Sequence, residues 1–111
     1  MVQEIYPDVE KIVKSYIDLL KKRIHVQRVI LFGSYARGNP RPWSDIDLAI
    51  ISPDFHGGTE QDHLLLAEIA RRITPQIEAI PYLPDDFLDC DSRSFEADIQ
   101  RHGKVIYDEA A

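Results

Sequence analysis

The chain has 111 residues, of which 44% are hydrophobic and 29% charged, and these values are typical of one folded domain rather than a disordered chain. Its formal net charge of -6 argues against broad binding to DNA or RNA, because a basic surface dominates the affinity of proteins for nucleic acids. No apolar run approaches the roughly 20 residues that span a bilayer, so we expect no membrane partner. No signal-peptide pattern stands at the N-terminus, and the one cysteine, Cys90, cannot form an internal disulfide, so we expect a cytoplasmic location.

The first half of the chain predicts one helix, two strands and a helical turn between the strands. Apolar residues at helical spacing predict an amphipathic helix from about Asp8 to Arg23. A short apolar run predicts a strand over residues 26–32, and the residues 34–37 that follow predict a brief helical turn that Gly38 closes. A loop rich in glycine and proline then leads to a second strand over residues 45–52.

The second half predicts two helices that alternate with two strands. The segment from Thr59 to Ile73 begins with a capping-box pattern and continues with apolar residues at helical spacing. Residues 76–82 predict a third strand, in which Pro81 implies an edge position or a strand end. A last helix over residues 94–101 and a short strand over residues 104–108 complete the chain.

This order of elements predicts an α/β (α+β) fold in a single domain over residues 1–111. We expect a two-layer sandwich in which a mixed β-sheet of about four strands carries helices on one face. The other face of the sheet would then be free for a functional site. The chain shows no internal repeat and no linker that would divide it.

Two aspartates, Asp45 and Asp47, stand at the start of the second predicted strand, where aspartate is unfavourable. Alternate residues of a strand point to the same face, so both carboxylates project together while Ile46 and Leu48 point into the opposite layer. Two ionised carboxylates this close repel each other, and a divalent cation removes the repulsion. Mg²⁺ prefers such hard oxygen ligands and completes its coordination with water and substrate phosphates. The pair therefore predicts a magnesium site that also meets phosphate.

A glycine and a serine, Gly33 and Ser34, stand where the first strand turns into a helical start, and ten residues separate Ser34 from the first aspartate. Glycine lets a ligand approach the backbone, and the Ser34 hydroxyl with the following N–H groups can hold phosphate oxygens. Arg37 lies one turn on and can add positive charge for a triphosphate. Ser44 either caps the turn before the aspartates or contacts a phosphate. Trp43 either stacks on a base or a partner, or fixes its loop to the domain.

A third carboxylate is usual in phosphoryl or nucleotidyl transfer with two metal ions. The third predicted strand offers Glu78, whose neighbours Ile77 and Ala79 would point the other way. If the second and third strands are adjacent, Glu78 joins Asp45 and Asp47. It would then hold the metal that activates the acceptor hydroxyl and accept its proton. The alternative is that Glu78 is an ordinary solvated side chain.

Three segments of the chain carry a resemblance to a known superfamily. They are LFGSYARG (residues 31–38), SDIDLAII (44–51) and IEAIPY (77–82). With them the chain resembles the DNA polymerase β-like nucleotidyltransferases, and more closely the minimal nucleotidyltransferases, which are often antitoxins paired with HEPN-type toxins. The resemblance implies a two-layer α/β fold, Mg²⁺, and a nucleoside triphosphate, commonly ATP. It implies transfer of a nucleoside monophosphate to a hydroxyl with release of pyrophosphate.

The resemblance also implies roles for individual residues and a partner. Gly33 and Ser34 match the phosphate-holding pair of the family, Asp45 and Asp47 match its metal-binding aspartates, and Glu78 matches the third carboxylate by its position in the fold. Larger members carry an additional helical domain, for which this chain has no room. In the antitoxin-like subfamily the partner is a HEPN ribonuclease, whose tyrosine hydroxyl receives AMP.

Three functions remain open from the sequence. The first is transfer of AMP to a protein hydroxyl, which depends on the carboxylates and the glycine-serine turn. The second is a binding module that masks its partner by contact, with the nucleotide site idle. The third keeps the chemistry but changes the acceptor to a small molecule, and the absence of a substrate domain counts against it.

Overall fold

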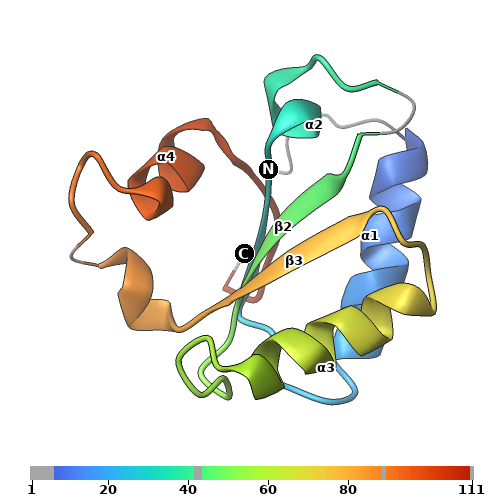
Figure 1. Cartoon of the computed structure of the whole chain (residues 1–111), viewed down its shortest axis with the longest axis horizontal. Coiled ribbons are helices and arrows are strands. Elements are labelled where there is room, and N and C mark those ends of the chain that lie inside the picture. The colour runs from blue at the N-terminus through green and yellow to red at the C-terminus, as the bar shows by residue number, and fades with distance from the viewer. Residues whose placement is uncertain (1–6, 42–43, 89, 111) are drawn as a thin grey trace.

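The structure is a computed structural model that describes residues 7–41, 44–88 and 90–110. Its helices and strands in chain order are α1 (Pro7–Leu20), β1 (Arg28–Phe32), α2 (Ser34–Arg37), β2 (Ile46–Ile51), α3 (Glu60–Arg71), β3 (Ile77–Tyr82), the 3₁₀ helix η1 (Pro84–Phe87), α4 (Phe95–His102) and β4 (Lys104–Asp108). Every predicted helix and strand is therefore present (Figure 1). Within the described ranges, no helix combines the length and the apolar character that crossing a bilayer requires.

The four strands form one mixed sheet in the order β3-β2-β1-β4. Strand β1 pairs antiparallel with β2 and with β4, whereas β2 and β3 are parallel. The parallel pair arises because α3 carries the chain from the end of β2 back to the start of β3. Strand β3 lies at an edge, as Pro81 in its sequence predicts, since proline cannot donate to a neighbouring strand.

Helices α1 and α3 cover one face of the sheet, and the main core lies between them and the strands. Alternation along β1 and β2 places Val29, Leu31, Leu48 and Ile50 on this face, where all four side chains are buried. The buried Tyr16 hydroxyl of α1 donates a hydrogen bond of 2.9 Å to the backbone carbonyl of Leu66 in α3. The two helices are thus joined by a specific contact as well as by apolar surface.

The opposite face is partly covered, whereas the sequence predicted that it would be free. Ile30, Ala49 and Ile51 on this face form a second buried cluster with Phe87 of η1 and Ile99 of α4. Figure 1 accordingly shows α4 and α1 on opposite sides of the strands. This cover extends to Phe32 at the end of β1, whereas Asp45 and Glu78, at or just before the starts of β2 and β3, stay exposed.

Two helix boundaries show how local signals act. The first helix ends at Leu20 rather than at the predicted Arg23, because the amides of Lys22 and Arg23 bond to carbonyls three residues back and tighten the chain into a turn. The capping box predicted for α3 is confirmed. The Thr59 side chain accepts from the backbone of Asp62, and the Asp62 side chain accepts from the backbone of Thr59.

Candidate active site

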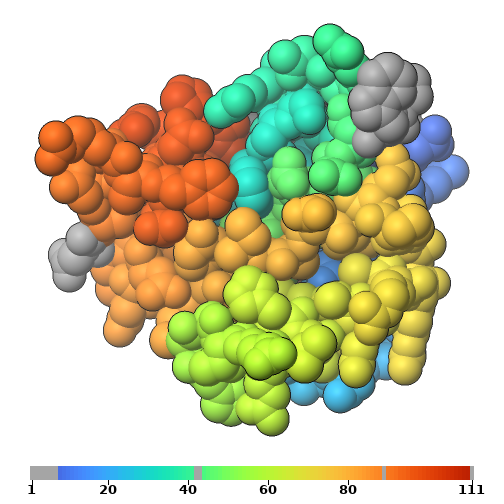
Figure 2. All heavy atoms as spheres, in the orientation of Figure 1, coloured from blue at the N-terminus to red at the C-terminus, as the bar shows by residue number. Residues whose placement is uncertain are grey.

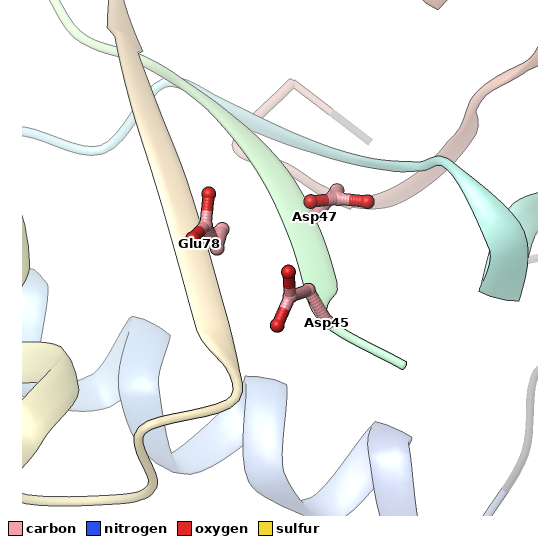
Figure 3. Close-up of side chains that lie close together, drawn as sticks. All are labelled: Asp45, Asp47 and Glu78. Atoms are coloured by element: carbon pink, nitrogen blue, oxygen red, sulfur yellow. The ribbon is translucent and has the colours of Figure 1, made fainter. Parts of the chain in front are cut away.

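Three carboxylates meet on the second face of the sheet, near the starts of β2 and β3. Asp47 of β2 and Glu78 of β3 are directly paired in the parallel ladder, so their side chains point to the same face. Asp45 precedes β2 by one residue and shares that face through strand alternation. Each residue offers an oxygen such that these atoms all lie within 4.8 Å of one another, and Figure 3 shows the three side chains gathered over β2 and β3. The structure thus brings together the three acidic residues singled out from the sequence.

The carboxylates of this cluster repel one another. Partial burial, the Asp45 carboxylate and the Glu78 carboxylate together raise the pKa of Asp47 from 3.8 to about 6. Asp45 and Glu78 are themselves exposed, so a ligand can reach them from solvent. Three hard oxygen donors, one of which is destabilised by its neighbours when ionised, suit a divalent cation such as Mg²⁺. The donor set therefore fits the metal that the sequence predicts.

Gly33 is required at its position for two reasons. Its backbone has φ 76° and ψ -151°, a conformation that side chains rarely allow. A Cβ atom at this position would lie 2.2 Å from Oδ2 of Asp47 and 3.1 Å from its Cγ. Phe32, the preceding residue, is the antiparallel partner of Asp47, and this pairing brings the glycine against the carboxylate. The turn after β1 and the acidic cluster consequently form one continuous site.

Ser34 and Arg37 are the first and last residues of α2, the short helix that starts at this turn. The first N–H groups of a helix have no partner within it, and the start of α2 follows directly after Gly33, which lies against the Asp47 carboxylate. Gly38 ends the helix in the left-handed conformation, as predicted. The guanidinium of Arg37 lies 3.6 Å from a carboxylate oxygen of Asp98 in α4. Arg37 therefore has an acidic neighbour on α4 that its place in the sequence did not indicate.

Ser44 has a structural role in the described chain. Its hydroxyl accepts a hydrogen bond of 2.8 Å from the backbone N–H of Arg41, which closes the turn before Asp45. Its carbonyl accepts from the side-chain amide of Gln76 at 3.3 Å. Sequence reasoning missed Gln76, although it stands two residues before the third carboxylate and so belongs to the same edge of the sheet. Trp43 lies outside the described residues.

Comparison with known proteins identifies the family. Residues 14–111 match the pattern of the family described as polymerase beta, nucleotidyltransferase. The chain belongs to the polymerase beta nucleotidyltransferase family. It is 30% identical over 102 residues to the "Putative protein adenylyltransferase MJ0604" of Methanocaldococcus jannaschii, a match that covers 88% of this chain and 97% of the relative.

Two solved structures share the fold. A crystal structure of a "putative nucleotidyltransferase" from Sulfolobus solfataricus superposes with a TM-score of 0.67 at 18% identity, over 93% of this chain and 83% of the other. A crystal structure described as "the toxin-antitoxin with AMP-PNP" gives a TM-score of 0.60 at 22% identity, over 89% of this chain and 73% of the other. The superfamily and the mixed four-stranded fold predicted from the sequence are thereby confirmed.

Proposed function

We propose that this nucleotidyltransferase transfers AMP from ATP, with Mg²⁺, to a tyrosine hydroxyl of a HEPN-type ribonuclease and thereby acts as an antitoxin. The observation that carries the proposal is the group formed by Asp45, Asp47 and Glu78, whose ligand atoms lie within 4.8 Å of one another beside the turn at Gly33. A cation site in contact with a backbone turn suited to phosphate is the arrangement that phosphoryl chemistry requires.

The residues on the β1 side of the site would bind the triphosphate. The absence of a side chain at Gly33 lets the Asp47 carboxylate lie against this turn, so a phosphate bound by the Ser34 hydroxyl would also be next to the carboxylates. Asp45, Asp47 and Glu78 would hold Mg²⁺. When bound, Mg²⁺ would neutralise charge on the phosphates and make the acceptor hydroxyl easier to deprotonate. Arg37, whose largely exposed guanidinium lies 3.6 Å from Asp98, would add positive charge for the triphosphate.

Glu78 is the residue that we assign to the acceptor. It lies on the edge strand β3, is exposed, and faces the side of the cluster opposite β1. The acceptor oxygen attacks the α-phosphorus, the bond from this phosphorus to the oxygen of pyrophosphate breaks, and the hydroxyl proton passes to Glu78 or to water. The products are the acceptor joined to AMP through its oxygen, and free pyrophosphate.

A protein acceptor is favoured by the openness of the site. Asp45 and Glu78 are both exposed, so the described chain does not enclose a substrate over these carboxylates. A partner surface can supply the missing wall, whereas a small molecule would be held weakly. The proposal is further supported by the named adenylyltransferase relative and by the toxin-antitoxin structure that shares the fold.

The test is transfer of label from ATP to a candidate partner. The purified protein is incubated with Mg²⁺, a HEPN-type protein and ATP labelled at either the α- or the γ-phosphate. We expect label from the α-position alone on the partner, and loss of labelling with Asp45→Asn or Asp47→Asn. Labelling from the γ-position would indicate phosphorylation instead, and label on a small molecule or RNA would change the acceptor.

A second candidate function is an antitoxin that masks its partner by contact. Leu88 and Val105, which are 73% and 39% exposed, line a hollow of about 720 Å³ away from the carboxylates, and such exposed apolar surface favours a contact role. A growth assay with the toxin separates the two functions. Under the enzymatic proposal Asp47→Asn fails to protect cells, whereas under the contact function it still protects them.

A further inference from the structure

An aromatic side chain without an assigned role stands exposed next to the end of β1. Phe95, the first residue of α4, is 50% exposed although it is large and apolar. Its ring meets the ring of Phe32 edge to face, with 5.5 Å between ring centroids and an interplanar angle of 83°. One face or edge of Phe95 is thus buried against another aromatic ring while the rest is open to solvent. A ring held in this way offers a flat apolar surface to a ligand.

Phe32 ties this aromatic pair to the active site. It is the cross-strand partner of Asp47, so the two side chains lie on the same face of the sheet. It also directly precedes Gly33, where the triphosphate is proposed to bind. Figure 2 shows the orange-red atoms of α4 beside the cyan atoms of the β1–α2 junction, with β2 and β3 next to them.

Helix α4 is fixed on both sides, so the aromatic pair is held in place. The Ser94 side chain caps the helix by accepting from the backbone N–H of Ala97 at 3.1 Å. In the first turn, Glu96 accepts a hydrogen bond of 3.1 Å from the Tyr82 hydroxyl of β3. Further along, Asp98 contacts Arg37 of α2, as described above. These contacts join α4 to β3 and to α2, which flank the carboxylates.

We propose that Phe95, supported by Phe32, stacks on the base of the bound nucleotide. This inference rests on the proposed nucleotidyl transfer and adds the subsite for the base. Across the sheet the order β3-β2-β1 places Glu78, Asp47 and Phe32 in a row. Because Glu78 is assigned to the acceptor and the β1 turn to the triphosphate, the aromatic pair lies on the nucleotide side of the row.

Stacking on Phe95 would bind the base of a nucleotide with little selectivity between different bases. Every base has a flat π-face, so stacking tolerates different bases, whereas hydrogen bonds to base edges do not. The polar side chains of the first turn of α4 are engaged, since Ser94 caps the helix and Glu96 bonds to Tyr82. We therefore expect purine nucleotides to share the gain in affinity that Phe95 supplies.

The experiment compares two probes by isothermal titration in the presence of Mg²⁺: a non-hydrolysable ATP analogue and inorganic tripolyphosphate, which has no base. In Phe95→Ala we expect affinity for the ATP analogue to fall about 5- to 10-fold, the low end for base–aromatic stacking because the ring is half exposed. Affinity for tripolyphosphate should stay unchanged. Phe95→Tyr, which keeps the ring, should bind as the wild type does.

Leu88→Ala is the matched control, because Leu88 is 73% exposed and apolar but lies after η1, away from the carboxylates. If Phe95→Ala weakens both probes equally or neither, base stacking by Phe95 is wrong while the proposed function stands. If the wild type binds neither probe, or if Asp47→Asn binds the ATP analogue as tightly as the wild type, the proposed function itself fails. An upfield shift of the base protons on binding, lost in Phe95→Ala, would support the stack independently of affinity.

Discussion

Substitution of Gly33 by alanine should damage both stability and the metal site. The backbone at this residue has φ 76° and ψ -151°, and a residue with a Cβ atom held there costs about 1–3 kcal/mol. The added Cβ would also lie 2.2 Å from Oδ2 of Asp47, closer than real contacts allow, so the carboxylate must move away. A displacement of about 1 Å at a reacting centre can cost on the order of 100-fold in rate. Gly33→Ala should therefore lose nearly all AMP transfer and bind Mn²⁺ weakly.

Gly38→Ala supplies the matched control. Gly38 also has a positive φ, 79°, but an added Cβ would meet nothing within 4 Å. It should lower the unfolding free energy by about 1 kcal/mol, a shift of roughly 4–8 °C in melting temperature, and leave Mn²⁺ affinity unchanged. Thermal unfolding and Mn²⁺ titration of both variants make the comparison. Wild-type Mn²⁺ affinity in Gly33→Ala would refute the close approach to Asp47 as a constraint on the site.

Other consequences concern pH and stability. Because the pKa of Asp47 is raised from 3.8 to about 6 in the metal-free fold, its contribution to stability is present below pH 4 and lost as pH rises to 6. Urea unfolding should show this loss against Asp47→Asn, by less than the roughly 3 kcal/mol that the whole pKa shift corresponds to, since the side chain is partly exposed; parallel pH profiles would contradict it. Tyr16→Phe removes the buried bond to the Leu66 carbonyl and should cost about 1 kcal/mol in the same assay, so an unchanged midpoint would count against that bond. Asp62→Ala removes the buried carboxylate that accepts from the backbone amides of His56, Gly58 and Thr59 and should cost about 1–3 kcal/mol, whereas a neutral effect would mean that the loop re-forms around water.

Much of the fold follows from local pattern. Helical spacing and the Thr59 capping box define α3, and strand alternation alone places Asp45 and Asp47 on one face. Whether Glu78 joins the two aspartates depends on which strands are neighbours, and the local pattern does not define this. Glu78 lies beside them because β2 and β3 pair in parallel, with Glu78 opposite Asp47.

The remaining features depend on tertiary contacts that no local pattern encodes. The sequence predicts a helix over residues 94–101 but not which face of the sheet it covers, so the contact between Phe95 and Phe32 could not be predicted. The acidic neighbour of Arg37 is likewise supplied by α4, far along the chain. The sequence allows either a turn cap or a phosphate contact at Ser44, and only the folded loop brings its hydroxyl to the backbone N–H of Arg41.

Binding of Mn²⁺ with and without a non-hydrolysable ATP analogue tests the central claim most directly, namely that Asp45, Asp47 and Glu78 form a cation site completed by a triphosphate. Electron paramagnetic resonance of Mn²⁺ reports the bound ion without requiring a protein partner. The wild type should bind Mn²⁺ more tightly when the analogue is present, and Asp47→Asn should lose both the basal affinity and this gain. Equal Mn²⁺ binding by the wild type and Asp47→Asn, with no effect of the analogue on either, would contradict the account.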